Sequence, residues 1–356
     1  MTAQGHLITR PMSISIQEFL TLRSSRPVAD VRSENEFASG HIPGAVNIPL
    51  LNNAERVAVG TDYKQKGKDA AIRTGFRLVG PRLEALVDAA AAFADGRELI
   101  VHCWRGGMRS RNFCVFAAMA GVRTLHVKGG YKAWRQLAME SFSKPFPFIV
   151  IGGRTGSGKS DLLRALANHG QQVIDLEALA NHKGSAFGGL LQPPQPTTEQ
   201  FQNDLFDEIL KLDLNRPIWI EDESIAIGKI FLPDVFWRRK RDSPVVRIEL
   251  DKATRVDRLV HEYGPADRGE FLQSMEKVTK KLGGQNFNEA KALLEQGDLH
   301  GTIAILLTYY DKAYMASLEK KNDQVIATVD WNGSDTDAVI PELIAIAERA
   351  HRPQPL

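Results

Sequence analysis

The sequence has few cysteines and no long apolar run. Two cysteines, Cys103 and Cys114, in 356 residues exclude a disulfide-stabilised scaffold and fit a reducing compartment, in which a lone thiol stays reactive. No stretch of 18 uncharged apolar residues is present, so we expect no membrane-spanning helix. The N-terminal segment MTAQGHLITRPMS lacks the apolar core of a secretory signal. These absences predict a cytoplasmic protein.

Strong net charge, internal repeats and low-complexity tracts are also missing. The formal net charge is +2, so any RNA or anionic partner has to be attracted by local patches. A length of 356 residues suggests two domains. The segment 139–147, MESFSKPFP, contains two prolines and precedes a fresh apolar strand. We therefore expect one domain over 12–140 and a second over 146–350.

Strand-like and helix-like stretches alternate in both parts, which predicts parallel α/β sheets. In the first part we expect strands at 27–32, 98–103 and 124–130, and helices at 83–94 and 111–122. In the second part we expect strands at 147–153, 172–177, 217–224 and 245–251, and helices at 159–170 and 197–212. The remainder, 254–351, is predicted to be mostly helical with a late strand at 325–331.

A cysteine stands at the predicted carboxyl end of a buried strand, in the stretch VHCWRGGMRSR at 101–111. Ligands bind at this end of parallel sheets. Amides around Gly106 and Gly107 and the following helix N-terminus favour an anion and a thiolate. Arg105 and Arg109 add fixed positive charge. We expect Cys103 to be a nucleophile aimed at an oxyanion or its sulfur or selenium analogue.

Other interpretations of this stretch remain open. The spacing H-C-x5-R is that of phosphatases that attack phosphate with a cysteine, and Cys103 could also be a packed core residue. Cys114 lies on an apolar helix face, which favours a purely structural role. His102 lies inside the strand, and a satisfied core histidine is favoured over a catalytic base.

The segment GRTGSGKS at 153–160 fits the phosphate-binding pattern G-x-x-x-x-G-K-S between a strand and a helix. Its amides would wrap a diphosphate, Lys159 would reach the terminal phosphates, and Ser160 would bind Mg²⁺. The predicted diphosphate-binding residues are Gly153, Thr155, Gly156, Ser157, Gly158, Lys159 and Ser160. In WIEDES at 219–224, Glu221 is the candidate second metal-supporting residue, with Asp222 and Glu223 as alternatives. An ATPase or a small-molecule kinase is the plain alternative.

Four cations beside aromatic residues occur in FWRRKRD at 236–242. Such a pattern suits RNA, whose phosphates bind basic side chains and whose exposed bases stack on rings. A run of charged residues is more often only a solvent-exposed surface with no binding role. The candidate tRNA-binding residues are Arg238, Arg239, Lys240 and Arg241, with Arg255, Arg258, Lys277, Lys280 and Lys281 following in the helical region.

The segment VADVRSENEFASGHIPGAVNIP at 28–49 is similar to the signature of rhodanese-like domains. This resemblance implies that Asp30, Arg32 and His41 hold the scaffold. The superfamily contains sulfur carriers and cysteine phosphatases, and the loop here is one residue longer than the usual sulfur-carrier loop. That length suits phosphatases and equally a bulkier ligand such as selenophosphate.

The whole chain, from about 15 to 345, resembles the tRNA 2-selenouridine synthase family. The resemblance rests on HCWRGGMRS, GGRTGSGKS, DLEALANHKGSAFG, WIEDESIAIG and YYDKAY, taken together. It implies a transferase that replaces the 2-sulfur of wobble 2-thiouridine (U34) in tRNAs for Lys, Glu and Gln by selenium. Selenophosphate and geranyl diphosphate would be co-substrates, Mg²⁺ an added ion and S-geranyl-2-thiouridine the intermediate. A selenophosphate-supplying enzyme would be a partner.

The resemblance also implies roles for the two motifs and a fold class. Cys103 would carry selenium or steer it, Arg105, Gly106, Gly107 and Arg109 would bind selenophosphate, and the glycine-rich motif would hold the diphosphate. The expected fold is α/β, with a rhodanese-like parallel-sheet domain followed by a P-loop NTPase-like α/β domain with a helical C-terminal part. Two alternatives stay open: a rhodanese-fold phosphatase or sulfurtransferase with a regulatory P-loop domain, and a nucleotide-switched RNA-binding module.

Overall fold

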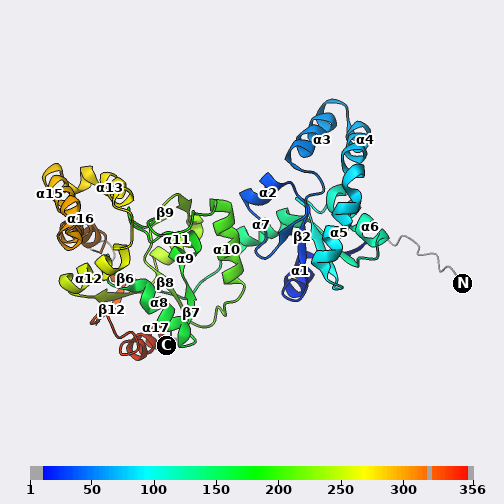
Figure 1. Ribbon diagram of the computed structural model, residues 1–356. Helices are drawn as coiled ribbons and strands as arrows, with labels where there is room; N and C mark the ends of the chain where they lie inside the picture. Colours follow the sequence, from blue (N-terminus) through cyan, green and yellow to red (C-terminus); the bar gives the residue numbers. More distant parts are fainter. Residues whose placement is uncertain (1–10, 319–322, 352–356) are drawn as a thin grey trace, which may run out of the picture. The chain divides into compact units, whose positions relative to one another are not determined.

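A computed structural model describes residues 11–318 and 323–351 (Figure 1). Most of the N-terminal segment examined for a secretory signal lies outside these residues. The chain divides into two compact units, Met1–Ser141 and Phe142–Leu356. Each unit contains one five-stranded sheet, and each is described by itself. No helix among the described residues is long and apolar enough to cross a membrane.

The first sheet is wholly parallel, with strand order β1-β5-β4-β2-β3. Its strands are β1 (Met12–Ile14), β2 (Val28–Asp30), β3 (Val46–Asn47), β4 (Leu99–His102) and β5 (Thr124–Val127). β2, β4 and β5 are buried along their whole length, as expected for strands covered by helices on both faces. Because β4 is central, the residue after it lies in the middle of the ligand-binding edge.

The described residues of the first unit also form seven α-helices and one short 3₁₀ turn. They are α1 (Ile16–Leu22), α2 (Glu34–Ser39), α3 (Asn53–Gln65), α4 (Lys68–Val79), η1 (Gly80–Arg82), α5 (Leu83–Ala94), α6 (Met108–Met119) and α7 (Gly130–Ser141). Ser15, Ser33 and Asn52 precede α1, α2 and α3 in capping boxes, each with a glutamate three residues later. These local signals fix where the helices begin.

The second sheet is also parallel, with strand order β12-β11-β6-β8-β7. Its strands are β6 (Phe148–Gly153), β7 (Gln172–Ile174), β8 (Ile218–Glu221), β11 (Val245–Glu249) and β12 (Val325–Asp330). β9 (Ala226–Ile227) and β10 (Ile230–Phe231) form a separate antiparallel hairpin. The glycine-rich motif therefore follows the central strand β6, and β8 beside it ends at Glu221.

Helices cover this sheet, and further helices follow in the C-terminal part of the unit. They are α8 (Lys159–Asn168), α9 (Leu176–Ala180), α10 (Thr198–Ile209), α11 (Asp234–Arg241), α12 (Lys252–Tyr263), α13 (Arg268–Glu276), α14 (Thr279–Leu282), α15 (Gly284–Gln296), α16 (Leu299–Leu318) and α17 (Ile340–His351). α12 to α16 share a core of their own, into which Phe187 of the 181–195 loop inserts.

The predicted fold class is confirmed, with two parallel sheets and a helical C-terminal region. Two boundaries differ from expectation. The helix predicted from 111 begins at Met108, so the cysteine loop is shorter than the sequence suggested. The strand predicted over 172–177 ends at Ile174, because the Asp175 side chain accepts a hydrogen bond from the Ala178 amide and starts α9.

Candidate functional site

The cysteine loop lies between the end of β4 and the start of α6. Gly106 takes a positive φ of 59°, and a side chain there would meet the Val127 carbonyl oxygen at the end of β5. Gly130, at φ 55°, has no room for a Cβ, which would lie 2.6 Å from the Gly106 nitrogen and closer to the Cys103 carbonyl oxygen. The Tyr131 amide donates to that oxygen at 2.9 Å. Backbone contacts therefore fix the loop's shape.

The Cys103 side chain is only 3% exposed and points into the loop. Its Sγ lies 3.2 Å from the Ser110 Oγ and accepts a hydrogen bond from the Gly107 amide at 3.4 Å. Donors of this kind at the start of a helix stabilise negative charge on sulfur. The geometry suits a thiolate nucleophile. Ser110, fully buried, is a contact that the motif spacing did not single out.

A cavity of about 420 Å³ opens over this cysteine and is lined by Arg56, Cys103, Trp104, Arg105, Gly107, Met108 and Arg109. Arg105 is exposed and free to turn toward a ligand. Arg109 instead forms two bonds with the Glu36 carboxylate, at 2.5 and 3.1 Å. Burial opposes ionisation of Glu36, but the bonds from Arg109 outweigh it and hold the pKa of that carboxyl below its ordinary value.

Arg56 of α3 is a cation at this cavity that sequence reasoning missed. Its Nε lies 3.6 Å from Glu36, so Glu36 stands between two guanidinium groups. The anion roles predicted for Arg105, Gly106, Gly107 and Arg109 stay predictions. The structure adds that Arg109 must share its charge with Glu36.

The residues assigned to the scaffold are enclosed. Asp30 and Arg32 are at most 1% exposed and form a bidentate ion pair, and the Arg32 guanidinium lies 3.9 Å from the Tyr131 ring centroid. His102 is fully buried; burial lowers its pKa, so its ring is neutral. Burial likewise raises the pKa of the Cys114 thiol to about 12. Cys103 is the reactive candidate of the two cysteines.

The glycine-rich loop of the second unit has the geometry of a phosphate cradle. Gly156 and Gly158 take φ values of 82° and 77°, and a Cβ on Gly158 would overlap the Trp331 ring. The Lys159 Nζ donates to the Gly153 carbonyl oxygen at 3.1 Å. The amides of the loop and the N-terminus of α8 thus surround a space suited to an anion.

Two arginines of α12 brace this loop from the helical region. Arg255, 1% exposed, donates to the Thr155 carbonyl oxygen at 3.2 Å and forms a bidentate pair with Asp311 of α16, at 2.8 Å for both bonds. Arg258 pairs with Asp161 at the start of α8. Arg255 is therefore part of the interior and is removed from the candidate tRNA-binding surface.

Carboxylates gather next to the loop. The Ser160 Oγ donates to Glu177 at 2.8 Å, whereas Glu221 is 1% exposed and accepts from the Glu177 amide at 2.9 Å. The carboxylate beside Ser160 is therefore Glu177 of α9, where the sequence suggested Glu221. Glu221, the last residue of β8, accepts from the Glu177 backbone instead, and its role at a metal stays a prediction.

Burial, reinforced by neighbouring acids, raises the pKa of Glu177 and Glu221, and that of Glu223 to about 7. Oxygen donors such as Ser160 and Glu177, together with substrate phosphates and water, fit the ligand preferences of Mg²⁺. Among the described residues, no three His, Cys, Asp or Glu side chains form a metal cluster of their own. A magnesium ion here would depend on the phosphates.

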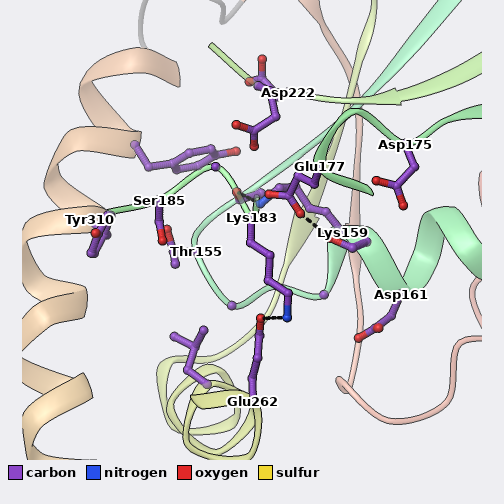
Figure 2. Close-up of a pocket in the computed structure, with 18 of the residues that line it drawn as sticks. Thr155, Lys159, Asp161, Asp175, Glu177, Lys183, Ser185, Asp222, Glu262 and Tyr310 are labelled. Atoms are coloured by element: carbon purple, nitrogen blue, oxygen red, sulfur yellow. Dashed lines mark hydrogen bonds and ion pairs between the residues drawn. The ribbon is translucent and has the colours of Figure 1, made fainter. Parts of the chain in front are cut away.

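These groups line a cavity of about 1470 Å³. Figure 2 shows Lys159, Glu177 and Asp222 around it, and Lys183 paired with Glu262 of α12. Cations at the cavity are Lys159, Arg164, Lys183, Arg241 and Arg258, and its apolar or aromatic lining includes Trp237, Leu259, Tyr263, Tyr310 and Tyr314. The cavity offers both phosphate-binding charge and an apolar wall.

The basic run on α11 does not form one surface. Lys240 is 1% exposed and its Nζ donates to the backbone oxygens of Glu221 and Glu223, so its assignment to tRNA binding is wrong. It lies on the same face as the buried Phe236, four residues earlier. Arg238, Arg239 and Arg241 are exposed, and their role stays a prediction.

Comparison with known proteins agrees with this organisation. Residues 15–137 match the rhodanese-like domain, and residues 146–335 match the tRNA 2-selenouridine synthase AAA domain. A tRNA 2-selenouridine synthase of Nitrosomonas europaea is 34% identical, over 83% of this chain and 90% of its own length. One of Bdellovibrio bacteriovorus is 38% identical, over 84% and 91%.

A solved N-terminal domain from Clostridium difficile 630 is 38% identical, with a TM-score of 0.33, over 35% of this chain and 97% of that one. The family assignment rests on the two relatives that match most of the chain, because these matches include both units. The chain belongs to the tRNA 2-selenouridine synthase family.

Proposed function

We propose that this protein replaces the 2-sulfur of wobble 2-thiouridine in tRNA by selenium, with selenophosphate as the donor and S-geranyl-2-thiouridine as the intermediate. The observation that carries the proposal is the presence, in one chain of this family, of a buried cysteine under an arginine-lined cavity and of a phosphate cradle with an apolar wall.

The second unit would perform the alkylation. The thiouridine sulfur attacks C1 of the geranyl group, the C–O bond to the diphosphate breaks, and the diphosphate leaves with the electron pair. The nucleobase loses its N3 proton. Lys159, the amides of the glycine-rich loop and a magnesium ion at Ser160 would neutralise charge on the leaving group. Tyr310, Tyr314 and Leu259 provide an apolar wall for the prenyl chain.

The first unit would supply selenium. Arg105, which lines the cavity, and the Gly107 amide would hold the phosphate part of selenophosphate above Cys103. The selenium of selenophosphate, already a nucleophile at the oxidation level of selenide, adds to C2 of the S-geranylated uridine; the C–S bond breaks, and geranylthiolate departs with the electron pair. Water then attacks phosphorus, the Se–P bond breaks, phosphate leaves, and selenium stays on C2. Cys103 would steer the selenium to the base. Alkylation makes this sulfur a leaving group.

Nucleoside mass spectrometry of tRNA tests the scheme. The protein is incubated with 2-thiouridine tRNA, selenophosphate and geranyl diphosphate, each small molecule being omitted in turn. We expect 2-selenouridine only with both, and the S-geranyl nucleoside without selenophosphate. Lys159→Ala should abolish geranylation, and Cys103→Ala should let geranylated tRNA accumulate. Loss of both steps in each variant would contradict this division of labour.

A further inference from the structure

The helices α3 and α4 form a pair that stands out from the sheet of the first unit (Figure 1). They pack through their inner faces, where the buried Thr74 donates to Asp62 at 2.7 Å. Gly67, at φ 87°, joins them. Neither motif described above includes this pair, and its outer faces contact no other described element in a way that buries them.

The outer faces carry large exposed side chains. Tyr63 on α3 is 56% exposed, and Phe76 on α4 is 62% exposed. Arg73, Phe76 and Arg77 are exposed and lie three and four residues apart, which places them on one face of α4. Exposed aromatic rings and exposed cations therefore occur together on the outer faces of the pair.

Charge on this pair is strongly positive. Residues 53–82 contain seven basic and three acidic side chains, which gives twice the formal net charge of the whole chain. Two of the acids are already engaged, Glu55 by Arg82 and Asp62 by Lys66. Lys64, Lys68 and Arg73 are exposed and form no ion pair with any residue that the structure describes. These three cations therefore face solvent.

The base of α3 reaches the cysteine cavity. Arg56, in its first turn, lines the cavity with Cys103 and lies 3.6 Å from Glu36, which also holds Arg109. Tyr63 is seven residues further on, on the same face of the helix. A polyanion lying along the pair would therefore run toward the thiol.

We propose that the exposed faces of α3 and α4 are a docking surface for the tRNA substrate, which delivers the modified base to Cys103; this inference rests on the proposed function. Phosphates would bind Lys64, Lys68 and Arg73, and unstacked bases would lie on Tyr63 and Phe76. An RNA suits the surface better than an acidic protein does, because exposed rings between cations offer stacking as well as charge.

The test measures binding of 2-thiouridine tRNA to the full chain by fluorescence anisotropy at several salt concentrations. The cation variant is Lys64→Ala with Arg73→Ala. Its matched control is Arg97→Ala with Arg123→Ala, two exposed cations that precede β4 and β5 at the opposite edge of the same sheet. A third variant, Tyr63→Ala with Phe76→Ala, removes the rings and leaves the charge.

We expect the cation variant to bind about tenfold more weakly, with the slope of log affinity against log salt reduced by about one for each cation. The ring variant should lose about tenfold in affinity with the slope unchanged. The control should match wild type. If the cation variant binds tRNA with the affinity and salt slope of the control, the proposed docking surface for tRNA is wrong. This is also the result expected if the surface binds an acidic protein instead.

The wild-type protein separates failure of this inference from failure of the proposed function. If wild type makes 2-selenouridine in tRNA and the cation variant binds tRNA as the control does, the docking surface is wrong and the proposed function stands. If the wild-type protein neither binds nor modifies tRNA, both the docking surface and the proposed function are wrong.

Discussion

Replacing Gly130 by alanine should deform the Cys103 loop without touching any chemically active group. Gly130 has φ 55°, and a Cβ there would overlap the Cys103 carbonyl oxygen and lie 2.6 Å from the Gly106 nitrogen. Both are backbone atoms, so no side-chain rotation relieves the contact. The left-handed conformation costs alanine about 1–2 kcal/mol, and overpacking against backbone adds about 1–3 kcal/mol.

Gly121→Ala is the matched control. Gly121 also has a positive φ, 82°, but a Cβ there meets nothing within 4 Å. It therefore isolates the conformational part, about 1–2 kcal/mol. Hydrogen exchange of peptides from β4 and β5, followed by mass spectrometry, reports the opening free energy of the first unit alone. The difference between the two variants measures the overlap.

Activity provides the second readout of the same pair. Gly130→Ala should lose 2-selenouridine formation and retain geranylation, because the phosphate cradle lies in the other unit. Gly121→Ala should retain both. Equal opening free energies in the two variants, or full selenium transfer by Gly130→Ala, would refute the argument that the 127–130 backbone shapes the cysteine loop.

Three further predictions concern single side chains. Lys240→Met should lower the free energy of unfolding of the second unit by about 2–3 kcal/mol, because two buried carbonyl groups lose their donor; Arg238→Ala on the exposed face, the control in urea unfolding, should change it by less than about 0.5 kcal/mol. Burial raises the pKa of Glu223 to about 7, so its protonated form stabilises the fold below about pH 4.5, and this contribution is lost as pH rises through 7. Glu223→Gln should therefore flatten the decline in the free energy of unfolding in urea over this pH range. An unchanged pH profile in this variant would contradict burial of the Glu223 carboxyl. Cys114→Ala should leave selenium transfer intact, and mass spectrometry after brief iodoacetamide treatment should find label on Cys103 and none on Cys114, whose pKa is about 12; label on Cys114 first would reverse the assignment.

The sequence predicted the central strands and the two loops well, because each depends on local patterns, but it did not predict the short edge strands β1 and β3. Buried strands were continuous apolar runs, and both loops stood directly after such a run. The 83–94 helix was predicted at its observed bounds, Leu83–Ala94, by its apolar face. The family assignment rests on the same local motifs and is borne out by the comparisons.

Residues brought in by other elements were not predictable in this way. Glu177 follows β7, which lies at the edge of the sheet, and only the strand order places it next to Ser160. Arg56 is one of two cations in α3, and only the fold brings it to Glu36. Lys240 could have been recognised, because it lies four residues after Phe236 and so shares its buried face.

The contact of Arg255 with Thr155 and Asp311 bears on how the second unit can be divided. A fragment that ends before α16 would keep the glycine-rich motif and its sheet but would leave a buried guanidinium without its carboxylate. Such a fragment should lose the cradle's shape before it loses its strands. The C-terminal helices are therefore structural supports of the glycine-rich loop, and cutting them away removes a contact on which the shape of that loop depends.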